Sequence, residues 1–148
     1  MIAVDKANLT GAIVGVSYYS ICIFIFAFRL AGRSQYGHWI GHAQFLAIVP
    51  LSYLLVVAPR FDRTPLYYLQ IILLLIFVIA ELLLDYILKV DFRHLRHAVI
   101  PYVMMFFAAT GGMLGVVALC GRAWSTASII LFLCMAILAF VQRRITGM

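Results

Sequence analysis

Five long apolar segments, separated by short polar connections, are the feature that most constrains how this chain folds. They occupy residues 8–30, 39–58, 65–88, 98–120 and 123–141. Each is about 19 to 24 residues long, and roughly 20 helical residues are needed to cross about 30 Å of hydrocarbon. Strands would cross a membrane only as a closed barrel of alternating polarity. The sequence therefore predicts an all-α integral membrane bundle of five transmembrane helices.

The composition agrees with this prediction and limits the classes of partner. Hydrophobic residues make up 66% of the 148 residues and charged residues 11%, against about 45–50% and about 25% in soluble domains. No segment remains for a soluble domain, so we expect a single polytopic membrane domain over residues 1–148. The net charge of +6 comes from basic residues between the apolar segments, where they anchor helices. The expected partner is the lipid bilayer, not nucleic acid.

The first segment and the cysteines exclude some alternatives. Asp5 and Lys6 nearly cancel before the first apolar run, and a secretory signal would carry a positive charge there, so we expect a retained span. The three cysteines lie far apart and form no Cys-x-x-Cys motif. The cysteines therefore do not support a zinc ribbon, a c-type haem or a redox-active dithiol. Each cysteine is expected to be a packing residue.

The distribution of basic residues predicts an orientation. One set of connections and the tail contain Arg29, Arg33, Lys89, Arg93, Arg96, Arg143 and Arg144. The opposite side contains Lys6, Arg60, Arg63 and Arg122. The positive-inside rule then places the N-terminus outside and the C-terminus in the cytoplasm of a multi-pass inner-membrane protein.

Small residues and one proline predict how the helices pack. Gly11 and Gly15 are four residues apart, and two further pairs with this spacing lie within residues 108–115. Such pairs allow helix backbones to approach closely, either within one bundle or between copies. Pro50 lies inside the second segment, where it is expected to kink the helix.

Two carboxylates in the third segment are the main functional clue. Glu81 lies about 12 Å along the helix from Lys89, which places it within the hydrocarbon layer, and Asp85 is half as deep. At 100° per residue the two share a helix face, which continues outward to Gln70 and Tyr67. Intramembrane carboxylates normally face the bundle interior and have a partner or a role in an ion or proton path.

The expected topology places several partners on the same side as these carboxylates. Arg29 ends the first span, and a polar face begins in the second span and continues to Tyr53. Four histidines are expected nearby: His38, His42, His94 and His97. We therefore predict a polar pocket that opens to the cytoplasm and is lined by the first four helices.

This pocket has several possible roles. In the simplest, Arg29 forms an ion pair with Glu81 or Asp85 and fixes the helix register. Alternatively, the carboxylates share a proton and bind a proton or a cation. Histidines four apart can also bind a divalent metal with carboxylate ligands. Haem is less favoured, because it needs axial histidines on facing helices.

The lead hypothesis is a small transporter or permeation unit. It would bind a proton, cation or small solute in the pocket formed by Glu81, Asp85, Arg29, His38, His42, Gln70 and Tyr53. Five spans favour a homo-oligomer or a partner membrane subunit for a complete path. The first alternative is a membrane metalloenzyme that uses the four histidines, and the second is a non-catalytic accessory subunit. The chain contains no Gly-rich phosphate loop, no Gly-x-Ser-x-Gly motif and no plausible Ser/His/Asp set on the outer side, so the sequence favours a role other than catalysis.

Overall fold

The chain is helical apart from short connections in the part that the computed structural model describes, residues 2–88 and 96–146. The elements in chain order are α1 (Ile2–Leu30), α2 (Ser34–Gly41), the 3-10 helix η1 (His42–Ala47), α3 (Ile48–Val57), the 3-10 helix η2 (Ala58–Phe61), α4 (Pro65–Glu81), the π-helix η3 (Leu82–Ile87), α5 (Arg96–Ala118) and α6 (Arg122–Thr146). They form five helical segments that are long and apolar enough to cross a membrane. The predicted all-α bundle with five candidate spans is thus confirmed.

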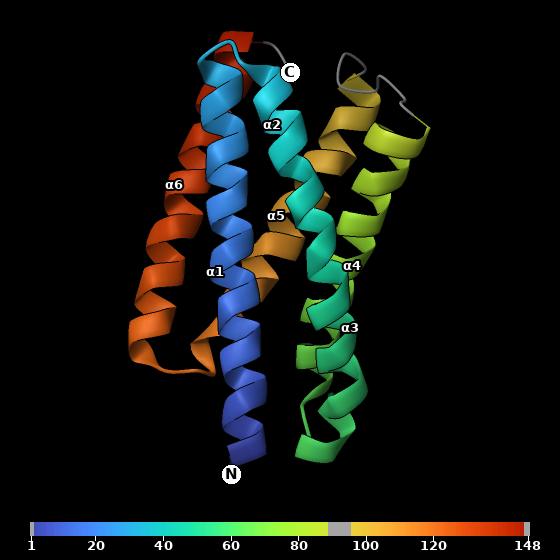
Figure 1. Cartoon of the computed structure of the whole chain (residues 1–148), viewed down its shortest axis with the longest axis vertical. Helices are drawn as coiled ribbons and strands as arrows, with labels where there is room; N and C mark the ends of the chain where they lie inside the picture. Colours follow the sequence, from blue (N-terminus) through green and yellow to red (C-terminus); the bar gives the residue numbers. More distant parts are fainter. Residues whose placement is uncertain (1, 89–95, 147–148) are drawn as a thin grey trace.

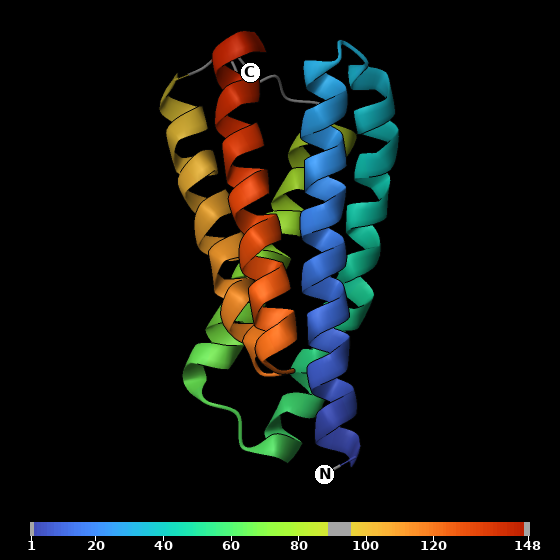
Figure 2. The same ribbon diagram turned by 90° about the vertical axis from the view of Figure 1, so that its left-hand side faces the viewer.

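The five segments stand side by side and alternate in direction, with the two termini at opposite ends (Figure 1). We call the end that holds the α1–α2 connection and the last turn of α6 the C-terminal end, and the opposite end the N-terminal end. The first helix lies at the centre, where it packs against α6, α2, α5 and α3. The same view turned by 90° shows α1 and α6 running parallel to each other (Figure 2). All five spans can therefore contribute to a site at one end.

The second span is less regular than a single α-helix. It begins at Ser34, five residues earlier than predicted, and passes through η1 before continuing as α3. Pro50 lies in the first turn of α3, and a proline has no N–H to donate to the carbonyl group four residues earlier, here that of Leu46. The irregular part of this span, the 3-10 helix η1, thus ends three residues before the proline that predicted a kink.

The third span changes its winding after Glu81. Over Leu82–Ile87 the hydrogen bonds join residues five apart, and the Leu88 N–H donates to the Leu83 carbonyl oxygen at 2.7 Å. A π-helical turn is wider than an α-helical turn. The angle of 100° per residue used to align Asp85 with Glu81 therefore does not apply beyond Glu81.

Small residues allow the helices to approach closely within the bundle. A Cβ atom on Gly11 would lie 2.9 Å from the Val116 side chain, and one on Gly15 would overlap Val117. The glycine pair of the first span is therefore used for packing α1 against α5. Close to this crossing lie fully buried side chains such as Leu54 and Met113.

Candidate functional site

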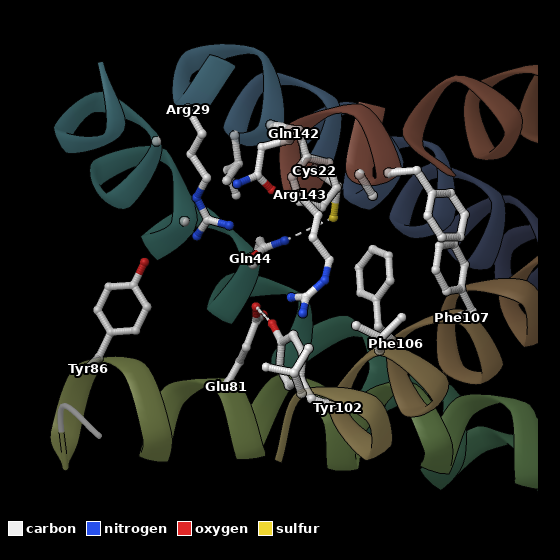
Figure 3. Close-up of a pocket in the computed structure, with 18 residues that line it drawn as sticks. Cys22, Arg29, Gln44, Glu81, Tyr86, Tyr102, Phe106, Phe107, Gln142 and Arg143 are labelled. Atoms are coloured by element: carbon white, nitrogen blue, oxygen red, sulfur yellow. Dashed lines mark hydrogen bonds between the residues drawn. The ribbon is translucent and has the colours of Figure 1, made fainter. Parts of the chain in front are cut away.

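A cavity of about 100 Å³ lies inside the C-terminal end of the bundle. Its polar lining residues are Cys22, Arg29, Gln44, Glu81, Tyr86, Tyr102, Gln142 and Arg143. They come from all five spans, including α6, whereas the sequence analysis expected only the first four. Figure 3 shows these side chains extending from helices on different sides toward a common space.

Two arginines reach into the cavity from neighbouring parallel helices. Arg29 lies in the last turn of α1, and Arg143 lies in the last turn of α6. Both positions suit a cation, because the carbonyl end of a helix carries partial negative charge. Both side chains are half-buried, and the described part of the chain offers neither guanidinium a hydrogen bond or an ion pair. Their donors therefore remain available on the cavity wall.

Glu81 enters the cavity from the C-terminal end of α4. Its Oε1 atom accepts a hydrogen bond of 2.7 Å from the Tyr102 hydroxyl of α5. An ion pair between Arg29 and Glu81 was one expectation from the sequence. Both residues do line the cavity, but the hydrogen bond to Oε1 comes from Tyr102. Glu81 is half-buried.

Two buried amides complete the polar lining. Gln44 is 5% exposed, and its Nε2 donates to the Cys22 Sγ at 3.1 Å. Gln142 is 2% exposed and lies next to Arg143 on α6. An amide side chain offers both donors and an acceptor. The cavity therefore combines two cations, one carboxylate and two amides among its described residues.

The histidines of the second span lie on another face of their helix. Gly37, Gly41 and Gln44 share the face toward the cavity, because positions four and seven apart align on a helix. His38 and His42 are each one residue further along, so they are turned by about 100° and exposed. They do not line the cavity.

These two histidines pack on Tyr86 instead. The His38 ring stacks on the Tyr86 ring at 4.4 Å between centroids, and the His42 ring meets it edge-on at 4.6 Å. The Tyr86 hydroxyl donates to the His38 backbone oxygen at 2.9 Å. Since Tyr86 itself lines the cavity, the histidines support the cavity wall from outside.

Two further predicted residues lie away from the cavity. Gln70 packs against the backbone of α5 at Gly112 and Gly115. It lies about 16 Å along the helix from Glu81, at 1.5 Å per residue. Tyr53 is 50% exposed on the outside of α3 and does not line the cavity. The predicted polar face of the third span does face α5, but it is spread over the length of the helix.

The remaining candidates do not assemble into a metal site in the described part of the chain. His94 and the side chain of Asp85 lie outside the described residues, and His97 is exposed at the start of α5. Within residues 2–88 and 96–146, no three histidine, cysteine or acidic side chains gather closely enough to hold an ion. The described geometry therefore gives the metalloenzyme hypothesis no donor set.

Several lining residues were not selected by the sequence analysis, although signals for them exist. Gln142 and Arg143 end the last span in "VQRR", which the analysis used only for orientation. Gly37 and Gly41 form another pair four apart within "GHWIGH". Tyr102 follows from the antiparallel pairing of α4 and α5, in which residues near 70 face residues near 112 and Glu81 faces Tyr102. Knowledge of helix partners was needed in each case.

Comparisons of the chain with protein-family models, curated proteins and solved structures find no match. The geometry of the cavity is therefore the basis for a function. That geometry is a small space at one end of a bundle of membrane-spanning length, with two arginines that have no described protein partner.

Proposed function

We propose that this chain is a membrane transporter or permeation unit that binds a small anionic solute in the cavity between Arg29 and Arg143. The observation that carries the proposal is the convergence of two half-buried guanidinium groups that no described side chain neutralises directly. Guanidinium groups bind carboxylates and phosphates through paired hydrogen bonds. The buried side chains of Gln44 and Gln142 border the same space.

The charges on the described lining residues favour an anion over a proton or cation. Arg29 and Arg143 contribute two positive charges, and Glu81 contributes one negative charge. A cation entering this space would meet a net positive wall, whereas an oxyanion would be attracted. The carboxylates alone suggested a proton, a cation or a small solute. With the two arginines included, the proposed solute is a small anion.

The finer points of topology are also part of this proposal. The basic residues at the C-terminal end of the bundle favour its placement in the cytoplasm, with the N-terminus outside and the chain in an inner membrane. The cavity would then open toward the cytoplasmic leaflet. A complete path across the membrane would require a second copy or a partner subunit.

Uptake into proteoliposomes tests the proposal. The probes are radiolabelled hexanesulfonate and inorganic phosphate, which stay charged and cross lipid slowly. We expect at least one probe to enter with the wild-type protein, and Arg29→Gln or Arg143→Gln to reduce its uptake by about tenfold or more, the loss expected for a charged hydrogen bond. Matched controls are Arg33→Gln and Arg144→Gln, which alter exposed arginines near the same helix ends. Equal uptake by all four variants would contradict the proposal. So would wild-type uptake that does not exceed the uptake of empty liposomes.

Glu81→Gln separates anion binding from cation binding by the sign of its effect. Glutamine keeps an acceptor for the Tyr102 hydroxyl but removes the negative charge. If the solute is an anion, uptake at low concentration should increase severalfold. A proton or cation site would instead lose its activity in this variant. That result would favour the hypothesis that the carboxylates bind a proton or a cation.

A further inference from the structure

The cavity has two chemically different halves. Arg29, Gln142 and Arg143 form the polar half at the ends of α1 and α6. Phe107 and Phe140 belong to the other half, which lies between α5 and α6. A site for a fully hydrated ion would not need an aromatic wall beside its guanidinium groups. The ligand that matches both halves has a charged head and an apolar body.

The apolar half reaches the outer surface of the bundle. Phe140 is 63% exposed, yet it also lines the cavity. Its ring stacks on that of Phe107, with 5.6 Å between centroids and 14° between planes. Helices α5 and α6 lie close together near their turn and further apart at the C-terminal end (Figure 2). This pair of rings therefore stands between the cavity and the surface that hydrocarbon would cover.

The depths of the two halves also match those of a lipid-like molecule. Arg29 and Arg143 lie in the last turns of their helices, where basic side chains meet lipid headgroups. Phe140 lies about 4.5 Å deeper than Arg143 along α6. The charged part of the site is thus at headgroup depth, and the aromatic part is within the hydrocarbon layer.

We propose that the solute is an anionic amphiphile, with a carboxylate or phosphate head and a hydrocarbon chain, which enters sideways from the bilayer between α5 and α6. This inference rests on the proposed function, because the same two arginines hold the head. The cavity of about 100 Å³ is several times larger than a single water needs. It accommodates a head and the first part of a chain, and the remainder of the chain stays in the bilayer beyond Phe140.

Thermal unfolding in phosphatidylcholine nanodiscs tests the inference with three probes. Dodecyl phosphate has both head and chain, inorganic phosphate has the head alone, and dodecyltrimethylammonium has the chain with the opposite charge. We expect dodecyl phosphate to raise the unfolding temperature by roughly 5 °C near saturation, and the other two probes to leave it unchanged. Arg143→Gln should abolish the shift, whereas Arg144→Gln should retain it. Phe140→Trp, which enlarges the ring at the opening, should reduce it.

The outcomes separate this inference from the proposed function. If inorganic phosphate stabilises the protein as much as dodecyl phosphate does, the amphiphile inference is overturned and the anion site stands. Equal stabilisation by dodecyltrimethylammonium would overturn recognition of the head. No shift with dodecyl phosphate, in a protein that transports hexanesulfonate or phosphate, would overturn the inference alone. No shift together with no anion uptake would overturn both proposals.

Discussion

The two ends of the bundle use arginine in opposite ways. At the N-terminal end, Arg63 Nη2 donates to Asn8 Oδ1 at 2.6 Å, and its guanidinium lies 4.8 Å from the centroid of the Tyr67 ring. At the C-terminal end, Arg143 extends into the cavity and has no such contact with the described residues. One arginine joins a connection to α1, and the other borders a space that a ligand can occupy.

The difference shows that the packing around an arginine, more than the residue type, decides whether its side chain stabilises the fold or can bind a ligand. Around Arg63 the Nη2 donor and the cationic face are used by the chain itself, so removal should weaken the fold. Around Arg143 they are not, so removal should leave the fold intact and affect binding. The following predictions test this contrast between a filled end and a hollow end.

The largest expected effect comes from adding a larger side chain at the tightly packed α1–α5 crossing, in comparison with the same change on the cavity wall. Gly15→Leu places a side chain against Val117 at the α1–α5 crossing and should lower the free energy of unfolding by about 3 kcal/mol. Ala139→Leu adds a side chain to the cavity wall, where space exists, and should change it by less than about 1 kcal/mol. Thermal unfolding in detergent micelles measures both. Equal losses would show that the cavity is as tightly packed as the crossing.

The second prediction exchanges each arginine for an apolar residue of similar length. Arg63→Met removes a charged hydrogen bond and a cation–π contact, and should lower the free energy of unfolding by about 2 kcal/mol. Arg143→Met should leave the stability unchanged or slightly raised, because it removes a partly desolvated charge that lacks a described partner. A large loss of stability in Arg143→Met would assign that arginine a structural role.

The third prediction concerns the hydrogen bond that the Tyr102 hydroxyl donates to Glu81 Oε1. Tyr102→Phe should lower the free energy of unfolding by about 1.5 kcal/mol, because a bond to a charged group is lost. Tyr53→Phe is the matched control, since its ring is exposed outside the cavity. Chemical unfolding in mixed micelles measures the difference. Identical stabilities of the two variants would mean that the Tyr102 contact contributes nothing.

The smallest expected effect distinguishes two glycines of α5. A Cβ atom on Gly115 would overlap the Gln70 side chain, whereas one on Gly111 would lie 4.0 Å from Phe132. Gly115→Ala should therefore lower the unfolding temperature slightly. Gly111→Ala should raise the free energy of unfolding by about 0.5 kcal/mol through better helix propensity. The opposite order would show that Gln70 moves aside easily.

Much of the fold follows from the sequence for a simple reason. The bilayer fixes the length of a spanning helix, so run length and polarity predict the five spans without knowledge of their contacts. The same argument places Arg29 and Glu81 at one end of the bundle, and both line the cavity. These inferences depend on position along a helix, which a single sequence records directly.

The rest of the site depends on rotation about each helix and on the choice of neighbours. A turn of about 100° separates the face of Gly37 and Gly41 from that of His38 and His42, and the sequence does not state which face meets α1. Arg143 enters the site because the first and last helices pack together, a contact between the ends of the chain. The spacing of Gly37 and Gly41 indicates a face suited to close packing but does not state which helix packs there.

The π-helical turn of the third span has a consequence for its length. A turn closed by bonds between residues five apart contains one more residue than an α-helical turn, so Leu82–Ile87 acts as a one-residue insertion in the helix. Removal of one residue from this segment would restore α-helical winding without breaking the span. Because the wider turn absorbs the extra residue, everything beyond the deletion would keep nearly its present rotation, whereas α-helical winding of the undeleted segment would turn Tyr86 by up to about 100° from the two histidine rings. The wider winding of this segment therefore keeps Tyr86 in position on the cavity wall, although the helix contains one residue more than an α-helix of the same rotation.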